Sequence, residues 1–114
     1  MKDFIRVMKA LSDPNRVKII KMLEEKELCV CEITAVLELA QPTVSKHLKL
    51  LEDAGLVASS KDGSWVIYRL ETAPGNRYAV AMLEHLQGWL AENPDIAAMA
   101  DRVKRVDRCR ITAA

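Results

Sequence analysis

Two cysteines separated by a single residue, Cys29 and Cys31, are the side chains of this chain best suited to chemistry. Thiolates prefer thiophilic ions over hard ions such as Mg²⁺, and they also react with oxidants. The spacing alone leaves both kinds of site open. On a regular helix the two side chains would point about 200° apart, because each residue turns the helix by about 100°. We therefore expect the first helical turn to open when both sulfurs bind one ion.

A third cysteine, Cys109, lies between Arg108 and Arg110. Positive neighbours favour the thiolate, which is the form that binds metals. An odd number of cysteines and the lack of an apolar export signal predict free thiols in the cytoplasm rather than a structural disulfide. No apolar stretch is long enough for a membrane helix, so we expect no membrane partner.

The paired cysteines stand at the start of the first of two predicted helices. Apolar residues at helical spacing predict one helix over residues 29–39 and a second over 41–54, with Pro42 favouring the start of the second. Two short helices joined by a tight turn form a helix-turn-helix, here over residues 31–54. Two strand-like segments around a glycine turn then predict a β-hairpin over 56–70, which we interpret as a wing.

The second of these helices carries polar and basic side chains on its predicted outer face. With Val44, Leu48 and Leu51 facing inward, short hydroxyls and an amide remain free to reach base edges, and lysines remain free to neutralise phosphates. Polar and basic wing residues can hold the flanking backbone. Lysines on an exposed helix are also ordinary surface residues, but the order of the elements favours DNA. The predicted DNA-contacting residues are Gln41, Thr43, Ser45, Lys46, His47, Lys49, Lys61, Ser64 and Arg69.

The length, composition and charge of the chain limit the possible fold class and number of domains. The 114 residues are half apolar and carry 17 basic and 16 acidic side chains, so a DNA-binding surface must come from local charge and not from net charge. We predict one winged helix-turn-helix domain over residues 1–114, mainly α with a small β-hairpin. Amphipathic helices within 1–11 and 75–107 carry apolar stripes that this head would not fully bury. We expect them to form a homodimer, which would read a twofold-symmetric operator.

Four segments of the chain closely resemble the ArsR branch of the ArsR/SmtB family of metalloregulatory repressors. They are LSDPNR at 11–16, ELCVCEI at 27–33, QPTVSKHLKLL at 41–51 and AGLV at 54–57. The resemblance implies a dimeric winged-helix repressor bound to a double-stranded, inverted-repeat operator ahead of arsenic-resistance genes. It also implies release of that operator when As(III) or Sb(III), the effector ion, binds the cysteines.

One residue departs from the pattern of this family. Arsenic-responsive members carry a third cysteine three residues after the second, where this chain has Thr34. A hydroxyl is a poor ligand for a soft ion, and trivalent arsenic favours three sulfurs. We therefore predict Cys109 as the third ligand beside Cys29 and Cys31, from the same or the partner protomer.

Other sites and functions fit the sequence less well. No cysteine precedes Cys29 to build a cadmium or lead site, and His85 alone cannot supply the four ligands of a zinc site. A repressor that responds to thiol oxidation or persulfides is the alternative on the same scaffold. We expect no enzyme and no organic cofactor, because no side chain is placed to activate a nucleophile and no phosphate-binding loop is present.

Overall fold

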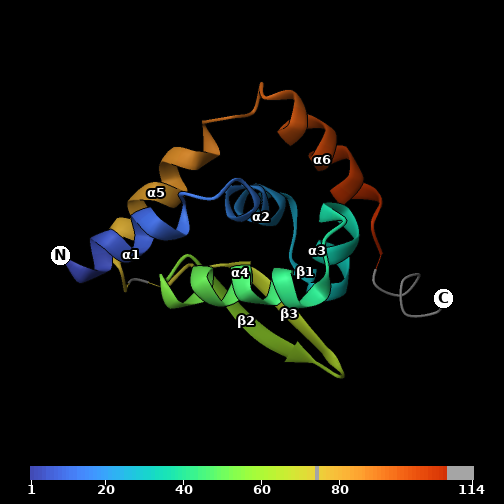
Figure 1. Cartoon of the computed structure of the whole chain (residues 1–114), viewed down its shortest axis with the longest axis horizontal. Helices are drawn as coiled ribbons and strands as arrows, with labels where there is room; N and C mark the ends of the chain where they lie inside the picture. The colour runs from blue at the N-terminus through green and yellow to red at the C-terminus, as the bar shows by residue number, and fades with distance from the viewer. Residues whose placement is uncertain (74, 108–114) are drawn as a thin grey trace.

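The computed structural model describes residues 1–73 and 75–107, and Cys109 lies outside them. Its elements are α1 (Lys2–Ala10), α2 (Pro14–Glu25), β1 (Leu28–Cys29), α3 (Val30–Leu37), α4 (Gln41–Asp53), β2 (Val57–Asp62), β3 (Trp65–Leu70), α5 (Arg77–Gln87) and α6 (Pro94–Arg105). α1 lies beside α5 at one end of the molecule, α6 lies above α3 at the other, and the β2–β3 hairpin projects below α4 (Figure 1). The predicted fold class, mostly helical with a small antiparallel sheet, is confirmed.

Three of the helices begin with a side-chain cap. The carboxylate of Asp13 accepts hydrogen bonds from the backbone N–H groups of Asn15 at 2.8 Å and Arg16 at 3.2 Å. Asn76 and Asn93 cap α5 and α6 in the same way. These caps satisfy N–H groups that have no partner inside the helix. Burial raises the pKa of Asp13, but the two N–H donors and the nearby positive charge outweigh it and leave that pKa below its usual value.

All six described helices contribute to the core, and α2 contributes the most residues. Val44, Leu48 and Leu51 of α4 are fully buried, as their spacing predicts. α6 buries Met99 and Val103 against α2 and α3 of its own chain. Packing of these helices on one another fixes the orientation of α4, and therefore the direction in which its outer face points.

The sheet contains one strand more than the sequence predicts. β1 pairs antiparallel with β3, and β3 pairs antiparallel with β2. The sequence predicts a helix from residue 29, but Cys29 has an extended backbone and α3 begins at Val30. A strand of two residues is too short to show an alternating pattern, which explains why it was missed. The hairpin turn contains Gly63, whose φ of +61° lies in the left-handed region.

The outer faces of α1 and α5 leave apolar side chains in solvent. Phe4, Ile5 and Val80 are 39%, 40% and 38% exposed, and the Phe4 ring meets that of Tyr78 edge to face. α1 and α5 therefore present a shared, partly apolar surface. Within 1–73 and 75–107, no helix combines the length and the apolar character needed to cross a bilayer.

Candidate DNA interface and thiol site

The outer face of α4 carries most of the predicted DNA-contacting residues. Gln41, Thr43, Ser45, Lys46 and Lys49 are all exposed. All five lie outside its buried apolar stripe, and Lys46 and Lys49 lie on the opposite side of the helix, which is the arrangement that a recognition helix needs. This side of α4 can offer hydrogen-bond donors and positive charge to a nucleic acid groove.

His47 is half-buried on α4, where it contacts Arg16 of α2. Nη1 of Arg16 lies 3.2 Å from Nδ1 of His47. Because a guanidinium has no acceptor, it must donate to Nδ1, and a neutral ring then carries its hydrogen on Nε2. The same guanidinium donates to the carbonyl oxygens of Ala10 at 2.7 Å and Lys9 at 3.1 Å. The sequence predicts His47 as a DNA-contacting residue but gives no sign of Arg16, since nothing in it signals a contact 31 residues away.

The wing residues fall into two groups. Lys61, opposite Val66 near the tip of the hairpin, and Ser64 in the turn are both exposed. Arg69 lies near the base of the hairpin, where its Nη1 lies 4.0 Å from Glu71 Oε1 and donates to Leu70 O at 3.4 Å. Lys61 and Ser64 are therefore placed to reach a neighbouring molecule, whereas Arg69 already has partners within the chain.

The structure brings the sulfurs of Cys29 and Cys31 together, joined in a disulfide with 5.5 Å between the Cα atoms. This corrects two expectations from the sequence. The cysteines are not free thiols here, and the first turn of α3 does not have to open for the sulfurs to meet. The physical reason is that Cys29 lies before the helix, at its N-cap, so the helical spacing of about 100° per residue does not separate the side chains.

The start of α3 surrounds this pair with backbone donors. Cys29 is 1% exposed, and its N–H donates to Oε1 of Glu32, a carboxylate that is itself only 4% exposed, at 2.8 Å. Free N–H groups at a helix N-terminus favour negative charge, and the buried carboxylate of Glu32 supplies it here. Sequence reasoning missed the capping role of Glu32, although Glu three residues after an N-cap is a known signal.

The donor set fits a soft ion better than a hard one. Two converging sulfurs are soft ligands, and Thr34, one turn after Cys31, adds an oxygen that is buried and has no hydrogen-bond partner within the described residues. The predicted third ligand, Cys109, lies outside those residues. Across 1–73 and 75–107 no group of three or more His, Cys, Asp or Glu side chains is arranged to hold a metal.

His85 and four of the methionines have structural partners. His85 is exposed and stacks on Trp89 with 5.2 Å between ring centroids. These four methionines take part in packing. Met22 and Met99 are buried in the core, and Met8 and Met82 pack against it.

Comparison with known proteins agrees with this geometry. Residues 13–59 match the family model described as "Bacterial regulatory protein, arsR family". The chain is 38% identical over 104 residues to the arsenic resistance transcriptional regulator ArsR1 of Pseudomonas putida, covering 87% of this chain and 79% of that one. It is 36% identical over 101 residues to the arsenical resistance operon repressor of Escherichia coli K12, with coverages of 88% and 76%.

The structural comparison points the same way. HlyU from Vibrio cholerae superimposes with a TM-score of 0.67 at 32% identity, covering 80% of this chain and 95% of that one. The homodimeric winged helix-turn-helix domain of Mb0332 from Mycobacterium bovis gives a TM-score of 0.64 at 28% identity, with coverages of 76% and 77%. The winged helix-turn-helix, the paired cysteines beside it and the similarity along most of the sequence place this chain in the arsR family of bacterial regulatory proteins, as a DNA-binding transcriptional regulator.

Proposed function

We propose that this protein represses an arsenic-resistance operon and releases its operator when As(III) or Sb(III) binds Cys29 and Cys31. The observation that carries the proposal is the convergence of the two sulfurs where β1, which holds Cys29 and pairs with the wing strand β3, meets α3, which holds Cys31. The names of the P. putida and E. coli relatives support the choice of effector. The operator is double-stranded DNA with an inverted repeat, and the protein acts in the cytoplasm.

Operator binding rests on α4 and the wing. Gln41, Thr43 and Ser45, at the N-terminal end of α4, enter the major groove and read base edges, because this is the end of a recognition helix that approaches the bases. Lys46 and Lys49 neutralise phosphates beside the groove. Lys61 and Ser64 hold the flanking backbone from the wing.

A homodimer presents two such heads. The regions that we assign to dimerisation, 1–11 and 75–107, include the exposed apolar side chains of α1 and α5. Burying Phe4 and Val80 against their copies removes apolar surface from water. A twofold axis through this contact pairs the two recognition helices, which accounts for the symmetry of the operator.

The effector acts on the reduced protein. A thiol reductant of the cytoplasm supplies the two electrons and two protons that convert the disulfide to two thiols. Each As–S or Sb–S bond then replaces one S–H bond and one bond from the ion to hydroxide, and the proton and hydroxide leave as water. Cys29 cannot move without disturbing the backbone pairing of β1 with β3, and α3 packs on α4. Occupation of the thiol site therefore favours a different position of the wing and of α4, which is the two-state coupling that release requires.

The test is binding of the reduced protein to a duplex from the region upstream of its own gene, followed by titration with arsenite. We expect arsenite to release the DNA from the wild type but not from Cys29→Ser or Cys31→Ser. If arsenite releases the DNA from Cys109→Ser at the same concentration as from the wild type, Cys109 is not a ligand of the ion. Thr34→Cys in the Cys109→Ser background is the matched variant, and it should restore sensitivity by returning a third sulfur.

Two results would overturn the proposal. One is retention of DNA by the wild type at every arsenite concentration. The other is release of the DNA by an oxidant and not by arsenite, with no release from Cys29→Ser or Cys31→Ser. That result would favour the alternative, a repressor that responds to thiol oxidation or persulfides.

A further inference from the structure

A hollow of about 700 Å³ lies between α1 and the C-terminal half of α4. Its polar lining comes from Lys2, Arg6, Lys9 and Arg16, with Asp53 on the opposite side. Ile5 and Leu50 supply exposed apolar surface within it, at 40% and 48% exposure. The hollow is therefore basic with an apolar floor.

The positive charge of this hollow is largely uncompensated. Asp53 is its one carboxylate, and that group already lies 3.6 Å from Nζ of Lys49. Within the described part of the chain, no carboxylate lies within ion-pair distance of Lys2, Arg6 or Lys9. Arg16 also donates to the carbonyl oxygens at the end of α1. These bonds reduce the partial negative charge that the helix dipole places at that end, beside the hollow.

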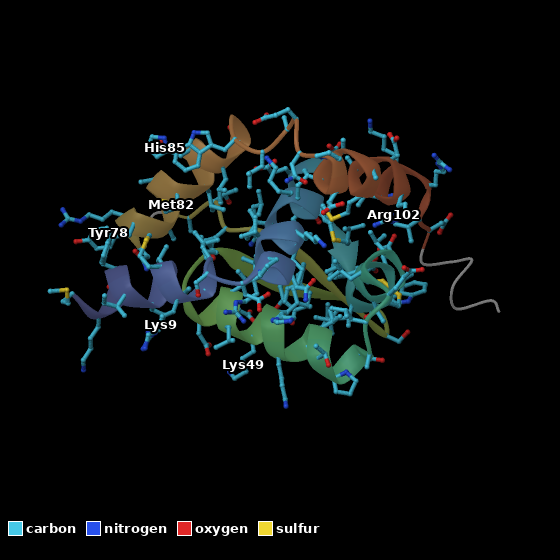
Figure 2. The ribbon with its side chains drawn as sticks, turned by 45° about the horizontal axis from the view of Figure 1, so that its top comes forward. Lys9, Lys49, Tyr78, Met82, His85 and Arg102 are labelled. Carbon is cyan, nitrogen blue, oxygen red and sulfur yellow. A yellow bond between two sulfur atoms is a disulfide. The ribbon has the colours of Figure 1, made fainter. Side chains whose placement is uncertain are left out.

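The hollow continues the recognition face of α4. Leu50 follows Thr43 by seven residues and Lys46 by four, so at about 100° per residue the three side chains point within about 60° of one another. Lys9 and Lys49 extend from α1 and α4 along the same edge of the molecule (Figure 2). A duplex that meets the outer face of α4 therefore passes the basic side chains of α1.

We infer that this hollow binds the DNA sugar-phosphate backbone beside the major groove, with Arg6 and Lys9 as phosphate ligands. The inference rests on the proposed operator binding. A recognition helix reads bases with its N-terminal residues, so its C-terminal half lies toward the groove wall, where phosphates are found. The apolar floor around Leu50 is suited to deoxyribose, which has no charge to satisfy. Such contacts position the protein and carry no sequence information.

The test compares Arg6→Gln and Lys9→Gln with Lys104→Gln, an equal loss of charge on exposed α6 at the other end of the molecule. Affinity is measured against salt concentration on two duplexes, the upstream region and a scrambled sequence of equal length. Each lost phosphate contact should reduce the slope of log affinity against log salt by about 0.9 on both duplexes, and Lys104→Gln should leave it unchanged.

Other results separate the explanations. Slopes for Arg6→Gln and Lys9→Gln equal to that of Lys104→Gln would overturn the inference. If those slopes are equal and sedimentation also shows that Arg6→Gln or Lys9→Gln weakens the dimer, the hollow is a contact between two copies of the chain instead. The scrambled duplex also reports phosphate contacts, so the change in salt slope can be measured without any sequence preference. A protein that does not prefer the upstream region, or does not respond to arsenite, would therefore refute the proposed function but not the phosphate contacts of the hollow.

Discussion

Cys29 lies directly opposite Ile67 in the antiparallel pairing of β1 with β3. One residue earlier, Leu28 lies opposite Tyr68, so the two residues of β1 anchor the strand that forms half of the wing. β3 in turn pairs along its whole length with β2, which carries Lys61. A change in the backbone at Cys29 therefore reaches the wing through three adjacent strands, without crossing the helical core.

Arsenite should loosen this strand pairing. In the reduced protein, we expect arsenite to increase amide hydrogen exchange several-fold in β1 and in β3 near Ile67, because the backbone at Cys29 shifts when both sulfurs bind one ion. Amides of α4 should change less. Hydrogen-exchange mass spectrometry of wild type and Cys31→Ser provides the measurement and its control. A response confined to α4 would show that the signal passes through the contact of α3 with α4 instead.

Lys21 should be a major contributor to stability. Its buried ammonium donates to the carbonyl oxygens of Leu86 at 2.7 Å and Trp89 at 2.9 Å, and lies 2.7 Å from Oε1 of Glu24. Lys21→Met keeps the aliphatic stem but leaves these groups without their partner, so we expect it to lower the free energy of unfolding by about 3 kcal/mol. Urea denaturation at fixed protein concentration measures the loss.

Two further variants test the cause of that loss. Lys104→Met, on the exposed surface of α6, should change stability little. Adding Glu24→Gln to Lys21→Met should recover part of the loss, because a neutral amide replaces a carboxylate that has lost its counterion. The loss in the free energy of unfolding for the double variant could instead equal the sum of the losses for Lys21→Met and Glu24→Gln. That result would mean that the ion pair contributes nothing beyond the two carbonyl contacts.

The two left-handed glycines of the wing region should differ in their tolerance of alanine. Gly55 has a φ of +77°, and an added Cβ would lie 3.3 Å from Cβ of Asn76, the N-cap of α5. Gly63 has a φ of +61° and nothing within 4 Å of such an atom. Both substitutions incur the backbone cost of about 1–2 kcal/mol, but only Gly55→Ala also displaces the cap. Thermal unfolding should show the larger loss for Gly55→Ala, and equal losses would exclude a role for the Asn76 contact.

The sequence was sufficient where periodic patterns and short-range signals decide the structure. Apolar spacing in α4 predicted its buried stripe, and Pro42 marked its start to within one residue. The glycine turn located the wing. Met22 and Met99 are buried for the same reason, since both lie on apolar helical stripes.

Features that depend on contacts between distant segments could not be predicted in this way. β1 has two residues, and its existence depends on β3, which lies nearly forty positions further along the chain. That strand moves Cys29 off the helix, so a calculation based on helical spacing gave the wrong relation between the two sulfurs. Likewise, no local pattern indicates that Lys21 would meet the end of α5, or that Arg16 would meet His47.

Asp13 should make stability depend on pH in the acid range. Its pKa in the folded protein lies below the ordinary value of 3.8, with two backbone N–H donors among the causes, so the cap stabilises the fold above that pH and is lost as the pH falls through the folded pKa. Asp13→Ala should cost about 1 kcal/mol near neutral pH. That cost should shrink below about pH 4. Asp13→Asn, which retains a capping oxygen, is the control in denaturation measured across this range. A cost for Asp13→Ala that does not vary with pH would contradict the assigned role of the carboxylate.

Arg16 should position the recognition helix through His47. The guanidinium holds the last carbonyls of α1 and Nδ1 of His47 at the same time, so it fixes α4 relative to a helix of the proposed dimer surface. Arg16→Lys removes the planar group that makes these contacts together while retaining the charge. We expect it to weaken binding to the upstream duplex several-fold and to leave the salt slope unchanged, because no phosphate contact is lost.

A double-mutant cycle with His47→Ala separates this coupling from a general loss of stability. If Arg16 acts through His47, the effects of Arg16→Lys and His47→Ala on DNA affinity should be less than additive, with a coupling energy of about 0.5–3 kcal/mol. Strictly additive effects would mean that Arg16 serves only the end of α1. A decrease in the salt slope for Arg16→Lys would instead make Arg16 a direct phosphate ligand, because lysine at that position would then fail to reach the backbone that arginine contacts.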